Sequence, residues 1–196
     1  TSILCTDNDA GGTITGLTIG NTYYIRMYTY YTTGPTVQNV CLKTPPPMTY
    51  VSSTTTQSST GSVTAGTINQ QIIRVAVVVN GDLNPLSVTQ LNLNTNGSTN
   101  PATDISAARV FYTGTSTTFS TTTQFGTTVN TPNGSYIVSG SQVLTGGVSN
   151  TTNYFWVVYD LPCNATATNV LDGECTGVTV GALQVPSITA PTGNRT

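Results

Sequence analysis

The chain has 196 residues, of which only 6% are charged, with a formal net charge of -2, five Lys plus Arg and no His. Five cations cannot form a patch that neutralises the phosphates of nucleic acid or an anionic membrane surface, so we exclude both as partners. Without histidine the chain lacks the commonest general base and zinc ligand, which argues against an enzyme. It also contains no run of about 18 apolar residues, so we expect no membrane insertion.

Residue usage predicts the fold class. Thr, Val, Ile and Tyr, which favour strands, are frequent, whereas the helix formers Ala, Glu, Lys and Met are sparse. We therefore expect an all-β protein with almost no helix. The length allows one large domain or two small ones.

The first 44 residues contain three predicted strands, at 13–17, 22–30 and 37–42. Three strands are too few to close a β-sandwich. This segment therefore corresponds to part of a β domain rather than to a complete one.

The same segment holds the metal candidates, Asp7 and Asp9. Their oxygen ligands stand at alternating positions before Gly11 and Gly12, a spacing that could wrap calcium. The terminal Glu of an EF-hand loop is absent, so an Asx turn is the favoured interpretation and calcium is the alternative. We expect no other cofactor.

Three consecutive prolines, at 45–47, follow this segment. Proline has no amide donor and restricts the residue before it, so the run predicts a stiff, extended linker. We place the domain boundary there, with domains at 1–44 and 48–196.

The second domain is predicted to be an antiparallel β-sandwich, Ig-like or jelly-roll-like. Its strands are expected at 72–79, 86–93, 107–112, 135–144, 153–161 and 176–185. Apolar residues occupy both phases of 72–79 and of 154–159, which predicts central strands with both faces covered. The phase slips within 86–93, which predicts a β-bulge at Thr89 or Gln90.

Two resemblances extend these predictions. Residues 16–26 (GLTIGNTYYIR) resemble the C-terminal half of fibronectin type III-like and pre-peptidase-like domains, although Ile19 stands where many relatives have proline. Four stretches of the second domain resemble the β-sandwich module beside BNR repeats in bacterial sialidases and in Bacteroidota surface proteins. These are 64–73 (TAGTINQQII), 104–114 (DISAARVFYTG), 153–160 (NYFWVVYD) and 169–175 (NVLDGEC). The resemblance implies an exported accessory module with no catalytic residues.

Four cysteines permit three pairings, and an exported protein meets an oxidising compartment. We predict the disulfides Cys5–Cys41 and Cys163–Cys175, because this pairing alone avoids tying the two domains together across the proline linker. A bond between Cys163 and Cys175 would close a loop of about a dozen residues and contribute roughly 3 kcal/mol.

Other side chains are assigned to the fold rather than to chemistry. Asp172 and Glu174 are the nearest approach to a glycosidase carboxylate pair, but they are predicted to lie in a turn, and an active pair is disfavoured. Arg74 and Arg109 lie inside strands and need partners, for which Asp104 and Asp160 are the first candidates. Trp156 is predicted to lie in the core. The aromatics available for a sugar-binding platform are Tyr112, Phe119, Phe125, Tyr136 and Tyr159.

These observations favour a non-catalytic spacer, display or adhesion module of a large secreted or cell-surface bacterial protein, exported by the type IX route that the resemblance implies. Its expected partners are neighbouring β-domains of the same polypeptide, surface glycans or the secretion machinery. The alternative is an accessory carbohydrate-binding domain of a secreted glycoside hydrolase such as a sialidase. Two or more aromatics exposed in a cleft would favour the alternative.

Overall fold

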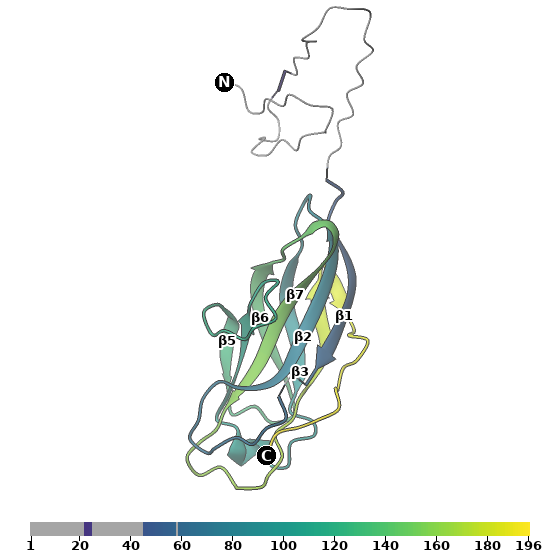
Figure 1. Cartoon of the computed structure of the whole chain (residues 1–196). Helices are drawn as coiled ribbons and strands as arrows, with labels where there is room; N and C mark the ends of the chain where they lie inside the picture. The colour runs from purple at the N-terminus through teal and green to yellow at the C-terminus, as the bar shows by residue number, and fades with distance from the viewer. Residues whose placement is uncertain (1–21, 25–44, 58) are drawn as a thin grey trace, which may run out of the picture. The chain divides into compact units, whose positions relative to one another are not determined.

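The computed structural model describes residues 22–24, 45–57 and 59–196 (Figure 1). The chain divides into two compact units, Thr1–Leu42 and Lys43–Thr196. Most of the first unit lies outside the described residues. The calcium candidates Asp7 and Asp9, the predicted Cys5–Cys41 disulfide and the strands predicted at 13–17 and 37–42 belong to that part of the chain.

The described part of the second unit consists of nine strands and one short helix. They are β1 (Thr49–Thr56), β2 (Gln70–Gly81), β3 (Ser87–Asn94), α1 (Pro101–Asp104), β4 (Ala107–Tyr112), β5 (Gln124–Asn130), β6 (Ser135–Val143), β7 (Gly147–Asp160), β8 (Glu174–Val180) and β9 (Ala182–Gln184). A larger sheet has the order β1-β2-β7-β4-β5, and a smaller sheet has the order β6-β3-β8-β9. Every pair of neighbouring strands is antiparallel.

The two sheets pack face to face around an apolar core, as predicted for an all-β sandwich. Val75 and Val77 of β2 and Phe155 of β7 are fully buried between the sheets. Leu91 of β3 and Val178 of β8 meet them from the smaller sheet. Burying each such side chain stabilises the fold by about 1.5–3 kcal/mol relative to exposure, so this core is what makes the unit compact.

The centre of the larger sheet is formed by β2 and β7, which confirms their predicted place. Their register runs from Gln70 opposite Tyr159 to Gly81 opposite Gly147. The side chains of β7 that point away from the core are covered as well, since Trp156 is only 3% exposed. Two-sided burial explains why residues 154–159 of this strand are continuously apolar.

One predicted irregularity of the strands is confirmed, and two other features differ from the prediction. The register of β3 shifts between Val88 and Gln90, which confirms the predicted bulge. The strand expected at 176–185 is interrupted at Gly181, whose φ of 68° ends β8 before β9 begins. Strands β1 and β5 were not predicted, because β1 is rich in Ser and Thr and β5 contains Gly126. That glycine has a φ of 65°, and any Cβ there would collide with the carbonyl of Ser139 on β6.

The first and last residues of this unit that the structure describes lie near opposite ends of β2. At one end, the Pro46 carbonyl accepts hydrogen bonds from the amides of Asp82 and Leu83, directly after β2. At the other end, the guanidinium of Arg195 bonds the carbonyl of Gln71, near the start of β2. The strand has 12 residues and is therefore roughly 36 Å long at about 3.3 Å per residue. Figure 1 shows the C-terminus at the end away from β1's first residues.

Candidate functional site

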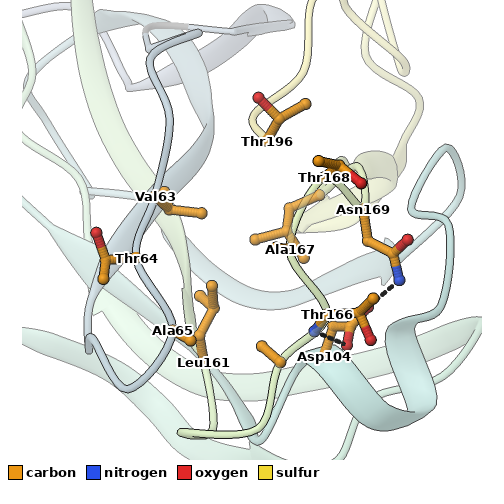
Figure 2. A pocket seen from close by; sticks show the side chains of 12 residues that line it. Val63, Thr64, Ala65, Asp104, Leu161, Thr166, Ala167, Thr168, Asn169 and Thr196 are labelled. Atoms are coloured by element: carbon orange, nitrogen blue, oxygen red, sulfur yellow. Dashed lines mark hydrogen bonds between the residues drawn. The ribbon is translucent and has the colours of Figure 1, made fainter.

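A pocket of about 240 Å³ lies at the end of the sandwich where the C-terminus is found (Figure 2). The loop that follows β7 forms one wall, and the loop between β1 and β2 forms the other. The lining residues are Val63, Thr64, Ala65, Asp104, Leu161, Ala165, Thr166, Ala167, Thr168, Asn169, Leu171 and Thr196. This volume is below the roughly 300–1,000 Å³ of typical small-molecule sites.

The only carboxylate in this pocket belongs to Asp104, the last residue of α1. Its side chain accepts hydrogen bonds from the Thr166 amide at 2.9 Å, from Asn169 Nδ2 at 2.6 Å and from Thr103 Oγ1 at 3.2 Å. Burial alone would raise the pKa of Asp104, but these hydrogen bonds outweigh it and hold the pKa below its ordinary value. The carboxylate therefore stays ionised and fixes the loop after β7, which is a structural role.

The two other carboxylates considered for catalysis lie beside the smaller sheet. Asp172 precedes β8, and Glu174 begins it. Asp172 Oδ1 accepts a hydrogen bond from the Gly173 amide, and its own amide donates to Ser98. Burial and the nearby negative charge of Glu174 raise the pKa of Asp172, and the Gly173 hydrogen bond partly opposes this. No cation faces this pair among the described residues, and the contacts of Asp172 close a turn.

The predicted ion pair involves Arg109 rather than Arg74. Both terminal nitrogens of Arg109 bond the carboxylate of Asp160, and one of them also bonds Asn69 Oδ1 at 2.7 Å. The Asn69 amide donates to the same carboxylate at 2.8 Å. Arg74 has no carboxylate partner in the described part of the chain, and neither Asp104 nor Asp160 reaches it. Its guanidinium instead lies over the rings of Tyr154 and Trp156, 4.9 and 5.3 Å from their centroids.

The predicted Cys163–Cys175 disulfide is absent from the structure, and both thiols are free. Cys175 lies in β8 opposite Leu93 and is fully buried in the core. Cys163 is exposed in the turn after β7, where its sulfur lies beside Gly66. Burial raises the pKa of Cys175 to about 12, so this thiol stays protonated and unreactive at neutral pH.

Aromatic side chains of the second unit do not form an exposed platform. Among the described residues from 45 onward, no Phe, Tyr or Trp belongs to the exposed large apolar side chains. Tyr112 donates its hydroxyl to Asn153 Oδ1, and Phe125 and Tyr159 are buried. Tyr136 packs against the core. Phe119 covers Trp156, with ring centroids 5.6 Å apart, and Trp156 is buried as predicted.

A second hollow, of about 360 Å³, lies on the outer face of the smaller sheet. Its lining combines polar and apolar side chains and consists of Gln90, Asn92, Leu93, Ser135, Tyr136, Ile137 and Thr176. Gln90 Nε2 donates to Asn92 Oδ1 at 2.6 Å, so part of its hydrogen-bonding capacity is used internally. Sequence analysis missed this surface, although the alternation of Leu and Asn in β3 was the signal that one face of this strand is polar.

The described residues contain no group of three or more His, Cys, Asp or Glu side chains that could hold a metal ion. Within the described residues, no helix is long and apolar enough to cross a membrane. No protein-family model matches the chain, and no curated protein matches it either. The resemblance to the BNR-associated module therefore stays a prediction.

Proposed function

We propose that the second unit is a non-catalytic spacer or display module of a large secreted or cell-surface bacterial protein. The observation that carries this proposal is the position of the chain's entry and exit at opposite ends of β2. A module with this arrangement lengthens the polypeptide by the length of its long axis. A module whose two ends lie side by side would instead project sideways from the polypeptide and add little length. Its partners are then the neighbouring β-domains of the same chain.

The contacts of the buried carboxylates support the same proposal. Asp104 holds the loop after β7, and Asp160 joins β7 to β4 through Arg109. The hydrogen bonds of these side chains join them to other segments of the same fold. The type IX export route and the adhesive role are supported by the family resemblance alone.

A second function, sugar binding as an accessory domain, is favoured by the polar side chains around the hollow on the smaller sheet. Gln90, Asn92, Ser135 and Thr176 could hydrogen-bond sugar hydroxyls. The exposed aromatic platform on which such domains commonly stack sugar rings is missing from the described residues of this unit. We therefore rank this function below the spacer.

A glycan-array screen of the full chain separates the two functions, with Asn92→Ala as the matched variant. A spacer gives no saturable binding to any glycan. Saturable binding that is lost in Asn92→Ala would overturn the spacer proposal and establish the hollow as a sugar site. The variant is expected to fold normally, because Asn92 is half-exposed on the outer face of β3.

A further inference from the structure

The residues after β9 form hydrogen bonds with strands of both sheets. Residues 187–195, here called the closing segment, run beside β1 and the residues after it. The Ser187 amide donates to the Ser53 carbonyl at 2.8 Å, and the Thr55 amide donates to the Ile188 carbonyl at 3.0 Å. Since both numbers in these pairs increase together, the closing segment and β1 point in the same direction.

Side-chain hydroxyls double these backbone contacts. Thr55 Oγ1 donates to the Ile188 carbonyl at 2.6 Å, and Ser187 Oγ donates to the Ser53 carbonyl at 3.1 Å. Ser53 and Thr55 are 2% and 1% exposed, so water cannot readily replace them as partners. The contact between β1 and the closing segment is therefore a four-bond patch that is buried on its β1 side, whereas Ser187 and Ile188 are exposed.

Arg195 fixes the far end of the closing segment. Its backbone exchanges two hydrogen bonds with Leu171, at 2.8 and 2.9 Å. Its guanidinium donates to the carbonyls of Gly61, Ser62 and Gln71. The residue is 9% exposed, and burial lowers the pKa of its side chain, although Arg stays ionised at physiological pH. One cation thus joins the closing segment to the loop after β1 and to the start of β2.

The closing segment also reaches the smaller sheet. The Cys175 amide, at the start of β8, donates to the Thr189 carbonyl at 3.0 Å. The segment therefore joins β1, an edge strand of the larger sheet, to β8 in the smaller one. Removing it would open this side of the sandwich.

We propose that the closing segment is a mechanical clamp, and that bearing tension along the polypeptide is a further function of this module. Tension enters at Pro46, just before β1, and leaves after Arg195. It therefore pulls β1 and the closing segment in opposite directions along the strand axis. Since these bonds lie across the direction of pulling, they resist together rather than breaking one after another. The inference rests on the proposed role of the unit as a segment within a longer chain.

Single-molecule pulling of the full chain in two geometries tests the clamp. In the axial geometry, handles are attached before Thr1 and after Thr196. In the peeling geometry, the second handle is inserted between Val148 and Ser149, in an exposed, irregular part of β7 near Gly81 and the entry end. The relevant unfolding event lengthens the chain between the handles by residues 45–196 in the axial geometry and by residues 45–148 in the peeling geometry. We expect a higher unfolding force in the axial geometry at every loading rate, because forced unfolding reports the rate of unfolding along the pulled direction.

Two matched variants separate the clamp from general stability. Arg195→Gln removes the guanidinium contacts of the closing segment. The control, Arg74→Gln, removes the same charge from a side chain that lies over the rings of Tyr154 and Trp156 on the outer face of the larger sheet. At constant axial force, Arg195→Gln should raise the unfolding rate about tenfold, the effect of losing charge-assisted hydrogen bonds. In the peeling geometry its effect should be small. Arg74→Gln should change the rates in the two geometries equally.

Equal unfolding forces in the two geometries of the unsubstituted chain would overturn the clamp, whether or not the variants fold. An Arg195→Gln variant with the same effect in both geometries would also overturn it. Neither result bears on the spacer function, which is overturned instead by saturable glycan binding. Glycan binding in turn leaves the measured force difference unaffected.

Discussion

The outer faces of the two sheets are built in opposite ways. On the larger sheet, the loop between β4 and β5 folds back over the strands, and Phe119 covers Trp156 and meets Phe111 edge to face at 6.2 Å. On the smaller sheet, Asn92 and Ile137 line an open hollow, and Ile137 is 55% exposed. One face is closed by protein, and the other is left to solvent.

This difference follows from the patterning of the strands. In β7 every residue from Phe155 to Asp160 is buried, so both faces of that strand must be covered. In the second half of β3, Leu alternates with Asn, and along β6 exposed residues alternate with more buried ones, so one face can remain in contact with water. A substitution on the outer face of the larger sheet should therefore be costly, and one on the smaller sheet should not.

The largest expected effect is at Asp160, on the closed face. Asp160→Ala leaves the Asn69 amide without its acceptor and leaves Arg109 with only Asn69 Oδ1, and the side chain of Arg109 is only 22% exposed. We expect the free energy of unfolding to fall by about 3 kcal/mol, the cost of breaking a largely buried pair from one side. Urea denaturation would measure it. The control is Asp82→Ala, at an exposed position, which should change stability by less than about 0.5 kcal/mol. Equal losses in the two variants would show that the pair is not special.

Phe119 tests whether the covering loop matters. Phe119→Ala should lower the free energy of unfolding by about 1–2 kcal/mol, because it removes two aromatic contacts and exposes the ring of Trp156. Tryptophan fluorescence should shift to longer wavelength at the same time. The neighbouring exposed residue Thr118 gives the control, Thr118→Ala, for which neither change is expected. An unshifted Trp156 spectrum in Phe119→Ala would mean that the loop does not shield this face.

Two carboxylates that precede strands of different sheets should respond oppositely to pH. Asp104 lies before β4, and its pKa is lower in the folded than in the unfolded chain. Its ionised side chain therefore stabilises the fold at pH values above the pKa of an unfolded Asp, about 3.9. This stabilisation is lost as the pH falls through the folded pKa. Asp172 lies before β8, and its raised pKa means that ionisation costs stability at neutral pH, a cost that is relieved as the pH falls through its folded pKa.

The substitutions that test this pair are Asp104→Asn and Asp172→Asn. At about pH 7, Asp104→Asn should destabilise the fold and Asp172→Asn should leave it unchanged or slightly more stable. At about pH 3 both differences from the unsubstituted chain should shrink. Denaturation at the two pH values measures this. A loss of stability in Asp172→Asn that equals the loss in Asp104→Asn would contradict the opposite signs.

The smallest effect is expected at Ile137, on the open face. Ile137→Ser should change the free energy of unfolding by no more than about 0.5 kcal/mol, because the side chain is already largely in water. Val138, the next residue of β6, faces the core and is fully buried. Val138→Ser is therefore the matched comparison and should be strongly destabilising. Similar effects at the two positions would mean that the open face is covered in solution.

The sequence carried enough information to predict the parts of the fold with strong patterns. The range 107–112 was predicted for β4 and observed unchanged, and Trp156 and the Arg109–Asp160 pair followed from placing apolar and charged residues within strands. Strands β1 and β5 could not be found in this way, because Ser and Thr in β1 are held by pairing with β2 rather than by their own preference.

The site features were less accessible to sequence reasoning. The disulfide prediction was wrong for Cys175 because nothing in the local pattern showed that its side chain points into the core. The pocket beside Asp104 depends on the path of the loop after β7, where Thr168 has a φ of 71°. The closing segment has no periodic pattern, and its place is set by long-range contacts of Ser187 and Arg195.

A tandem of two copies of residues 45–196, joined head to tail, tests the in-line arrangement of the module most directly. The prolines at 45–47 then lie at the junction and keep it extended. Small-angle X-ray scattering should give a maximum dimension close to twice that of one copy, since each copy adds its long axis, of which β2 alone covers roughly 36 Å. A tandem only slightly longer than a single copy, with the two sandwiches side by side, would contradict the spacer function.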